Sequence, residues 1–237
     1  MSYVAGFVAA VPAANKEAYR KHAASAVALF KELGVTRMVE AWGDDVPEGK
    51  VTDFKGAVKA QPGEVIVFSW HEYPSREAAE ASNQKMMSDP RMRELGATMP
   101  FDGERMIFGG FAPIIDARTA GPMGYVDGAL VAVPASNKNA YQELAARQAA
   151  VIREYGATRV VEAWGDFVPD GKLTDFKRAV KATGDEQVVF CWVEWPSKAV
   201  RDAAWSKVFA DPRMHPDSAP YDGGRRVHGG FMPLLDT

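Results

Sequence analysis

The order of apolar and polar residues along the chain predicts alternating strands and helices. Residues 3–11 alternate with the period of a strand, and Pro12 ends that pattern. Asn15 precedes residues 16–33, whose apolar positions recur at helical spacing, and Gly34 follows as a helix stop. Further segments follow in the same way: strands over 36–44, 64–73 and 105–115, and a helix that starts at 74–75 and reaches about 89. The order βαββαβ is that of a ferredoxin-like unit.

This pattern occurs twice. Moving the sequence by 122 positions superposes residues 3–95 on residues 125–217 without a gap, and more than half of the positions are identical. A closing phrase recurs at an offset of 120, as MPFDGERMIFGGF in residues 99–111 and APYDGGRRVHGGF in residues 219–231. We therefore expect three parts: a first repeat over 1–117, a linker over 118–124 and a second repeat over 125–237.

Each repeat is too small to cover both faces of its own sheet, so we expect the two to cover each other. The predicted fold class is α+β, with two ferredoxin-like βαββαβ units fused into an intramolecular dimeric α+β barrel. The paired glycines of the closing strands, Gly109-Gly110 and Gly229-Gly230, predict a β-bulge or the close approach of another backbone or of a ligand.

Composition places the chain among ordinary globular proteins. Of its 237 residues, 47% are hydrophobic and 25% are charged, and the longest apolar runs have the length of a strand rather than of a membrane span. The apolar start of the chain is similar to a secretory signal, but it lacks basic residues and recurs at residues 125–135, so we expect a strand there. The single cysteine, Cys191, excludes an intramolecular disulfide and favours a reducing, cytoplasmic location.

Five segments together resemble one bacterial family. They are YVAGFVAAVP, GDDVPEGKVTDFKGAVKA, VFSWHEYPSRE, DPRM and MPFDGERMIFGGF, at residues 3–12, 43–60, 67–77, 89–92 and 99–111. Over nearly all of both copies the chain is similar to the YbaA-like family, whose domain is called domain of unknown function 1428. The resemblance implies a ferredoxin-like, dimeric α+β-barrel fold and a neighbourhood that includes antibiotic-biosynthesis-type monooxygenases. It implies no catalytic residues. Family members are usually single units that pair, whereas this chain would supply both units.

Carboxylates and tryptophans alternate along two predicted strands. Glu40 and Trp42 share one strand face, and Trp70 and Glu72 share a face of the next strand. If both faces point the same way, Glu40 and Glu72 lie beside indole rings and are candidates for general acid or base chemistry. Alternatively, both carboxylates pair with basic residues and only determine the strand register. The full set of ligand-binding candidates is Trp42, Trp70, Arg105, His22, Glu162, Trp164, Trp192 and Glu194.

Histidines distinguish the two copies. His71 and His22 of the first copy correspond to Val193 and Leu144 of the second. If this strand face turns toward the helices, the first copy encloses a polar pocket, with His71 as a third catalytic candidate, and the second copy a drier one. The alternative is a buried histidine that forms part of the core.

The templates of known catalytic classes are missing from the sequence. It contains no GxSxG, P-loop, GxGxxG after a strand, or HExxH. None of the four histidines recurs in the other copy, so we predict neither a metal site nor a cofactor.

The net charge of −3, with acidic residues interleaved among the lysines of residues 44–59, argues against nucleic-acid binding. The sequence favours a cytoplasmic protein that binds a small organic ligand in a cleft of the pseudo-dimeric barrel, or a cofactor-independent enzyme. A non-catalytic interaction or scaffold protein is the alternative, and RNA binding is a distant third. We expect no membrane partner. The repeats are expected to pair within the chain, and further homodimerisation stays open.

Overall fold

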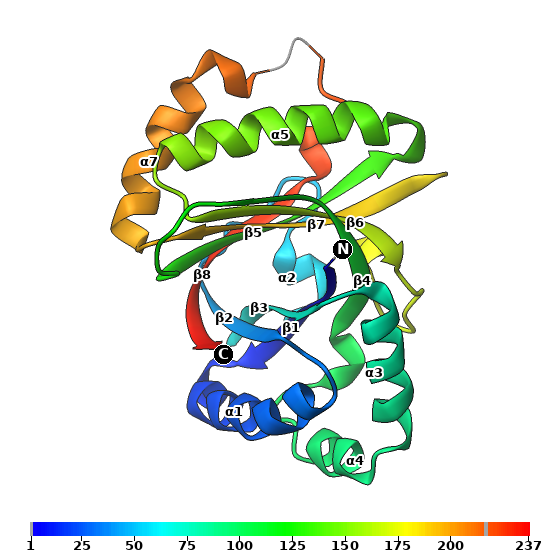
Figure 1. Cartoon of the computed structure of the whole chain (residues 1–237). Helices are drawn as coiled ribbons and strands as arrows, with labels where there is room; N and C mark the ends of the chain where they lie inside the picture. The colour runs from blue at the N-terminus through cyan, green and yellow to red at the C-terminus, as the bar shows by residue number, and fades with distance from the viewer. Residues whose placement is uncertain (1, 216–217) are drawn as a thin grey trace.

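A computed structural model describes residues 2–215 and 218–237 (Figure 1). The longer elements of the first repeat are β1 (Tyr3–Pro12), α1 (Lys16–Glu32), β2 (Arg37–Asp45), α2 (Phe54–Ala57), β3 (Glu64–Tyr73), α3 (Arg76–Ser88), α4 (Pro90–Ala97) and β4 (Ile107–Arg118). Those of the second repeat are β5 (Tyr125–Pro134), α5 (Lys138–Glu154), β6 (Arg159–Phe167), α6 (Phe176–Ala179), β7 (Glu186–Trp195), α7 (Lys198–Ala210) and β8 (Val227–Asp236).

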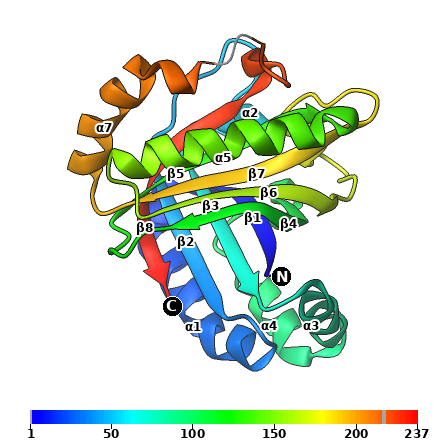
Figure 2. The same ribbon diagram turned by 45° about the horizontal axis from the view of Figure 1, so that its top comes forward.

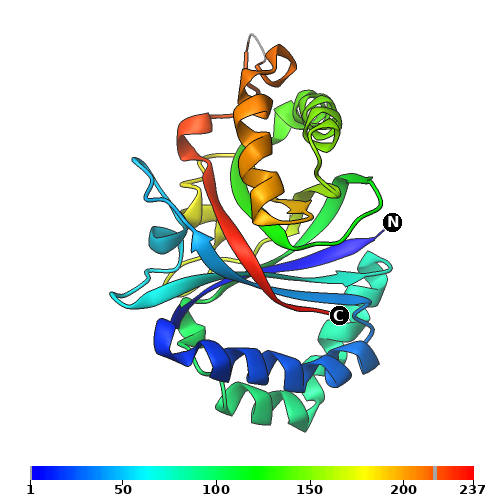
Figure 3. The ribbon, with the colours of Figure 1, turned by 90° about the vertical axis from the view of Figure 1, so that its left-hand side faces the viewer.

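The eight strands form one closed barrel, in the order β1-β3-β2-β8-β5-β7-β6-β4. Every neighbouring pair is antiparallel. Each repeat supplies four adjacent strands, and two seams join the repeats, β2 with β8 and β4 with β6. Figure 3 shows β8 running beside β2. The predicted fusion of two ferredoxin-like units into a single α+β barrel is confirmed.

Helices cover the outside of the barrel on two opposite sides. The helices α1, α3 and α4 lie over the strands of the first unit, and α5 and α7 lie over those of the second (Figures 1 and 2). The helix α1 turns one face inward because Tyr19, Ala23 and Ala26, its buried residues, recur at helical spacing. The outer face of each half of the barrel therefore packs against the helices of its own unit. This contact is separate from the barrel interior.

The units differ after α3 and α7. In the first unit Asp89 caps α4, because its carboxylate accepts a hydrogen bond from the Arg91 backbone N–H. The corresponding segment of the second unit is only a short 3₁₀ turn, Pro212–Met214. His215 ends this turn in an extended conformation, as expected for a residue that precedes a proline.

The paired glycines have the role predicted from the sequence. The pairing of β4 with β6 shifts register between Gly110 and Phe111, which is the bulge that the glycines indicated. A side chain at Gly110 would collide with the hydroxyl of Tyr3, which donates a hydrogen bond to Asp166 at 3.0 Å. The group that approaches the glycine closely is thus a tyrosine side chain.

Aromatic rings from both units fill the centre of the barrel. The Phe68 and Phe190 rings stack with centroids 4.5 Å apart and an interplanar angle of 8°. The Trp70 and Trp192 rings lie next to them, with centroids 4.6 Å apart. All four side chains are almost completely buried. The interior is therefore a packed core that belongs to both units.

One end of the barrel is closed by the charged segment of residues 50–59 and by its counterpart in the second unit, residues 172–181. Each contains a one-turn helix, α2 or α6, whose phenylalanine is fully buried. Phe54 packs edge-on against Phe68, and Phe176 packs in the same way against Phe190. The Thr52 hydroxyl donates to the Ala179 carbonyl at 2.6 Å, so the two segments also hold each other.

Ion pairs close the opposite end of the barrel and cross between the units. Arg37 Nη1 of the first unit lies 2.7 Å from Glu194 Oε1 of the second, and Arg159 Nη1 lies 2.6 Å from Glu72 Oε1. The Trp70 indole N–H donates to the Glu72 carboxylate at 3.1 Å. The four charged groups satisfy one another, as burial of charge requires.

Among the helices of residues 2–215 and 218–237, none has both the length and the apolar character needed to cross a membrane.

The shared core predicts the effect of truncating one of its rings. We expect Phe190→Ala to lower the free energy of unfolding by about 3–5 kcal/mol, because the variant loses buried area and leaves a cavity that the surrounding strands cannot close. Met87→Ala, at a side chain that is 87% exposed, is the control and should change stability by less than about 0.5 kcal/mol. Urea unfolding monitored by circular dichroism measures both, and equal stabilities would contradict a shared core.

Candidate functional site

The structure separates the carboxylates and tryptophans that the sequence placed on one patch. In the pairing of β2 with β3, Glu40 lies opposite Ser69, while Val39 lies opposite Trp70. Because side chains alternate along a strand, Glu40 and Trp42 turn toward the helices, whereas Trp70 and Glu72 turn into the barrel. The expected patch of two carboxylates and two indoles is therefore not formed.

The second unit repeats this separation. Glu162 lies opposite Cys191 and Val161 opposite Trp192, so Glu162 and Trp164 face the helices. Trp192 and Glu194 belong to the barrel interior, where the Trp192 indole N–H donates to Glu194 at 3.0 Å. Glu72 and Glu194 are thus held in the ion pairs that close the barrel, which agrees with the register-determining alternative for Glu72.

Three other candidates, Arg105, Trp42 and Trp164, each contact charged side chains. The Arg105 guanidinium pairs with Glu64 at 2.7 Å and with Asp102 at 2.8 Å, at the edge of the first unit. The ammonium of Lys16 lies 5.4 Å from the centre of the Trp42 ring, and that of Lys138 lies 5.1 Å from the Trp164 ring, both as cation–π contacts.

On the helix-facing side, each unit contains a hydrogen-bonded pair of a tyrosine and a glutamate. The Tyr19 hydroxyl donates to Glu40 at 2.6 Å, and the Tyr141 hydroxyl donates to Glu162 at 2.7 Å. Burial raises the pKa of Glu40 to about 7 and also raises the pKa of Glu162. The Glu40 carboxyl can therefore hold or release a proton near neutral pH.

A cavity of about 550 Å³ lies beside the second of these pairs. One wall is the outer face of β5 to β8, and the other consists of α5, α7 and the two residues Met214 and His215. We call it the second-unit cavity. Its polar lining includes Glu162, Tyr141, Cys191, Arg226 and His228. Of the ligand-binding candidates, Glu162 and Trp192 border it, although the indole ring of Trp192 packs inside the barrel.

Smaller side chains account for this cavity. In the first unit, the His71 ring lies between Phe7 and Phe30, with centroid distances of 5.1 and 4.7 Å. The corresponding positions of the second unit hold smaller residues, and all three line the cavity: Ala129, Ile152 and Val193. The space that three rings fill in the first unit is thus left open in the second.

This finding reverses one expectation from the sequence. The strand face that carries His71 does turn toward the helices, and the two clefts are unequal. However, His71 is packed in a core between two phenylalanines, and the large polar cavity belongs to the second unit, which we expected to be drier. His22 is on α1, where its Nδ1 lies 3.4 Å from the Thr98 hydroxyl.

The cavity carries charges of both signs. Asp127 accepts hydrogen bonds from the Trp195 and Trp205 indoles at 2.7 and 2.8 Å, and the Arg201 guanidinium lies 2.7 Å from it. Burial, together with the nearby Arg226, lowers the pKa of His228, so this histidine is neutral at pH 7. Among the described residues, no group of three or more histidine, cysteine, aspartate or glutamate side chains is arranged to hold a metal ion.

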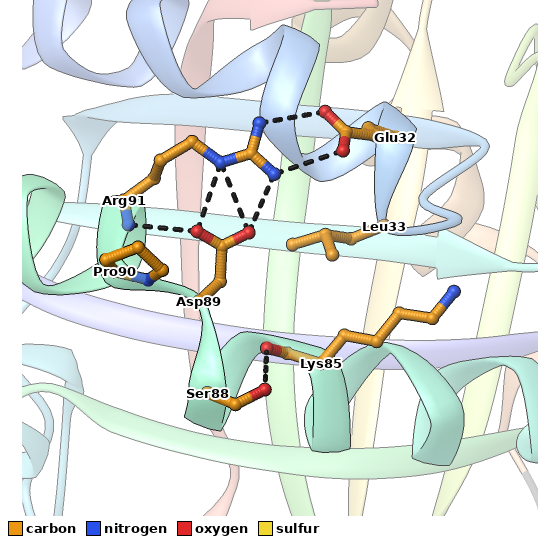
Figure 4. Close-up of a pocket in the computed structure, with 7 residues that line it drawn as sticks. All are labelled: Glu32, Leu33, Lys85, Ser88, Asp89, Pro90 and Arg91. Atoms are coloured by element: carbon orange, nitrogen blue, oxygen red, sulfur yellow. Dashed lines mark hydrogen bonds and ion pairs between the residues drawn. The ribbon is translucent and has the colours of Figure 1, made fainter.

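A second depression lies on the surface of the first unit, where α1, α3 and α4 meet (Figure 4). Its most prominent group is Arg91, which pairs with Glu32 at 2.9 Å and with Asp89 at 2.7 Å. The depression is open to solvent, and its guanidinium already has two carboxylate partners. It is therefore a poor candidate for a ligand site.

Sequence reasoning missed several residues that shape the second-unit cavity. Ala129, Tyr141 and Trp205 line it, as does Arg226, and none was singled out. The signal was present in the comparison of the two copies, since Phe7 corresponds to Ala129 and Met106 to Arg226. Differences in size and charge between copies, rather than shared motifs, indicate this site.

The packing of His71 predicts a pH effect on stability. Burial lowers the pKa of His71 to about 4, whereas an unfolded histidine has a pKa near 6.5. Its contribution to stability is therefore present above pH 6.5 and is lost as the pH falls toward 4, because the unfolded chain binds the proton more tightly. Between pH 7.5 and pH 5 the wild-type protein should lose about 2 kcal/mol more than His71→Leu does.

The measurement is denaturant unfolding of both proteins at the two pH values. Glu40, whose raised pKa makes stability fall as the pH rises through 7, is present in both proteins and cancels in the comparison. Equal losses in the two proteins would contradict the buried, neutral histidine.

The chain is similar in sequence to known bacterial proteins. The Escherichia coli K12 protein "Uncharacterized protein YbaA" is 66% identical over 116 residues, which cover 99% of that protein and 49% of this chain. The protein of the same name from Shigella flexneri matches equally well. One repeat of this chain thus corresponds to a whole relative.

Solved structures share the fold at low sequence identity. A "Putative monooxygenase" from Fusobacterium nucleatum superposes with a TM-score of 0.62 and 11% identity, covering 99% of this chain and 93% of that chain. An "anthrone oxidase-like protein" superposes with a TM-score of 0.54 and 11% identity, covering 100% of this chain and 92% of that chain. A family model described as "Protein of unknown function (DUF1428)" matches twice, at residues 2–103 and 124–223. The chain belongs to the DUF1428 family, as a tandem duplication of its domain.

Proposed function

We propose that this protein binds a small organic molecule in the second-unit cavity. The observation that carries the proposal is the exchange of Phe7, Phe30 and His71 for Ala129, Ile152 and Val193, which leaves a cavity of about 550 Å³ where the first unit is packed. Open volume in a folded core costs stability, so a cavity of this size is typical of a site that a ligand fills.

The lining of the cavity supports this function. Binding sites for small molecules combine apolar walls with a few polar groups that orient the ligand. Here the walls include Val160 and Ile152, and the polar groups include the Tyr141 hydroxyl and the Glu162 carboxyl. An interaction or scaffold protein, the alternative from the sequence, predicts filled clefts instead.

The Tyr141–Glu162 pair gives the site a way to move a proton. A carboxyl group with a raised pKa, hydrogen-bonded to a phenol at 2.7 Å, can donate or accept a proton without a cofactor. We therefore extend the proposal to cofactor-independent proton transfer on the bound molecule, with Glu162 as the acid or base. The oxidase and monooxygenase names of the structural neighbours agree with small-molecule chemistry, but the likeness itself concerns the fold. The presence of only one cysteine in the chain supports a cytoplasmic location for this function.

A thermal-shift screen against a library of metabolites tests the binding proposal. A ligand at 100 times its Kd should stabilise the protein by about 2.7 kcal/mol. Ala129→Phe introduces into the cavity the residue that the first unit has, and should weaken binding of any hit at least tenfold. The matched control is Ala146→Phe, which adds the same side chain on the exposed face of α5 and should leave binding unchanged.

Two outcomes would contradict the proposal. A library without a hit would remove its support, and a hit that Ala129→Phe binds as tightly as the wild type would place the ligand elsewhere. For the proton-transfer step, Glu162→Gln should retain binding and abolish turnover of any hit that is converted.

A further inference from the structure

Arg226 is the unusual residue of the second-unit cavity. It immediately precedes β8 and borders the cavity together with the Tyr141–Glu162 pair. Its charge is close enough to interact with Glu162, Tyr141, Cys191 and Tyr221. The side chain nevertheless remains accessible, because it lines a hollow rather than a packed core.

Within residues 2–215 and 218–237, no carboxylate lies within ion-pair distance of the Arg226 guanidinium, and no acceptor hydrogen-bonds to it. Other arginines nearby are engaged. Arg201 pairs with Asp127 at 2.7 Å and with Asp45 at 2.9 Å. Arg225, the preceding residue, pairs with Glu186 at 2.7 Å. The Arg226 side chain is exposed, so its guanidinium is free to pair with an anion that enters the cavity.

Comparison with the first unit argues against a purely structural role. There, Met106 occupies the position of Arg226, and the Tyr19–Glu40 pair forms in the same way, with a hydrogen bond of 2.6 Å. An arginine is therefore not needed to hold the tyrosine–glutamate pair. The positive charge is an addition of the unit that has the cavity.

The remaining walls are apolar and aromatic. Trp205 reaches the cavity from α7, and its ring stacks on Phe209 with centroids 5.2 Å apart. Ile152 and Val160 also line the cavity, and Trp205 packs against the apolar cluster that contains them. A molecule with a flat apolar body and one anionic group at its end would match this arrangement, because the body contacts the walls while the anion reaches the guanidinium.

We propose that the second-unit cavity binds an aromatic carboxylate, with Arg226 as the residue that pairs with the carboxylate group. A guanidinium suits this group because its planar fork donates two parallel hydrogen bonds to the two oxygens. This inference rests on the proposed function and adds the chemical class of the ligand to it. Tyr141 and Glu162 then lie on the same side of the cavity as the bound carboxylate.

Isothermal titration with two probes of equal shape tests the inference. 2-Naphthoate carries the carboxylate, and 2-naphthamide is its neutral counterpart. Wild-type protein should bind 2-naphthoate at least tenfold more tightly than 2-naphthamide. In Arg226→Met, which introduces the first-unit residue, the preference should fall to twofold or less, while the Kd for 2-naphthamide changes by no more than twofold.

Lys207→Met is the control for a general change in charge, because it removes a cation from the exposed face of α7. It should keep the wild-type preference, and a loss of preference there would overturn the role of Arg226. Equal binding of both probes by the wild type would refute the preference for an anionic ligand but leave the proposed binding function intact. If neither probe binds at about 1 mM, the aromatic class is wrong, while the metabolite screen with Ala129→Phe still decides the proposed function.

Discussion

The stacking of Phe68 on Phe190 joins the two units into one core, since each ring comes from a different unit. The rest of the barrel depends on this contact. The ion pairs that close one end also cross between the units, from Arg37 to Glu194 and from Arg159 to Glu72. A buried charge whose partner is removed is strongly destabilising. Neither unit could therefore keep its interior packed and its charges paired without the other.

This shared interior explains where the two copies differ. Changes inside the barrel affect both units at once, whereas the two outer faces contact separate helices and can change independently. The first unit retains rings at Phe7 and Phe30, and the second has Ala129 and Ile152 in their place. A dimer of identical single units would carry two equal clefts. Fusion into one chain permits one unit to serve packing and the other to hold a cavity.

The sequence predicted the fold far better than the site. Periodicity located the main strands and helices, and the repeat together with the family resemblance predicted the barrel. The prediction of the site failed because the register between the strands was not known. Alternation shows that Glu40 shares a face with Trp42 and that Trp70 shares a face with Glu72. Whether the two sets meet depends on the strand pairing, and a shift of one residue decides it. The cavity depends on side-chain sizes on several elements, which no local pattern encodes. Phe54, hidden among charged neighbours, was likewise not recognised as part of the core.

The position of β8 between β2 and β5 has a consequence for biosynthesis. The first unit leaves the ribosome well before β8 has been made, so the free edge of β2 and the inner aromatic face, including Trp70, remain without their partners during that interval. Closure is thus delayed until after the second unit emerges. A nascent chain of this type is exposed to edge-to-edge association with its neighbours on the same polysome, and chaperones have a defined segment to protect.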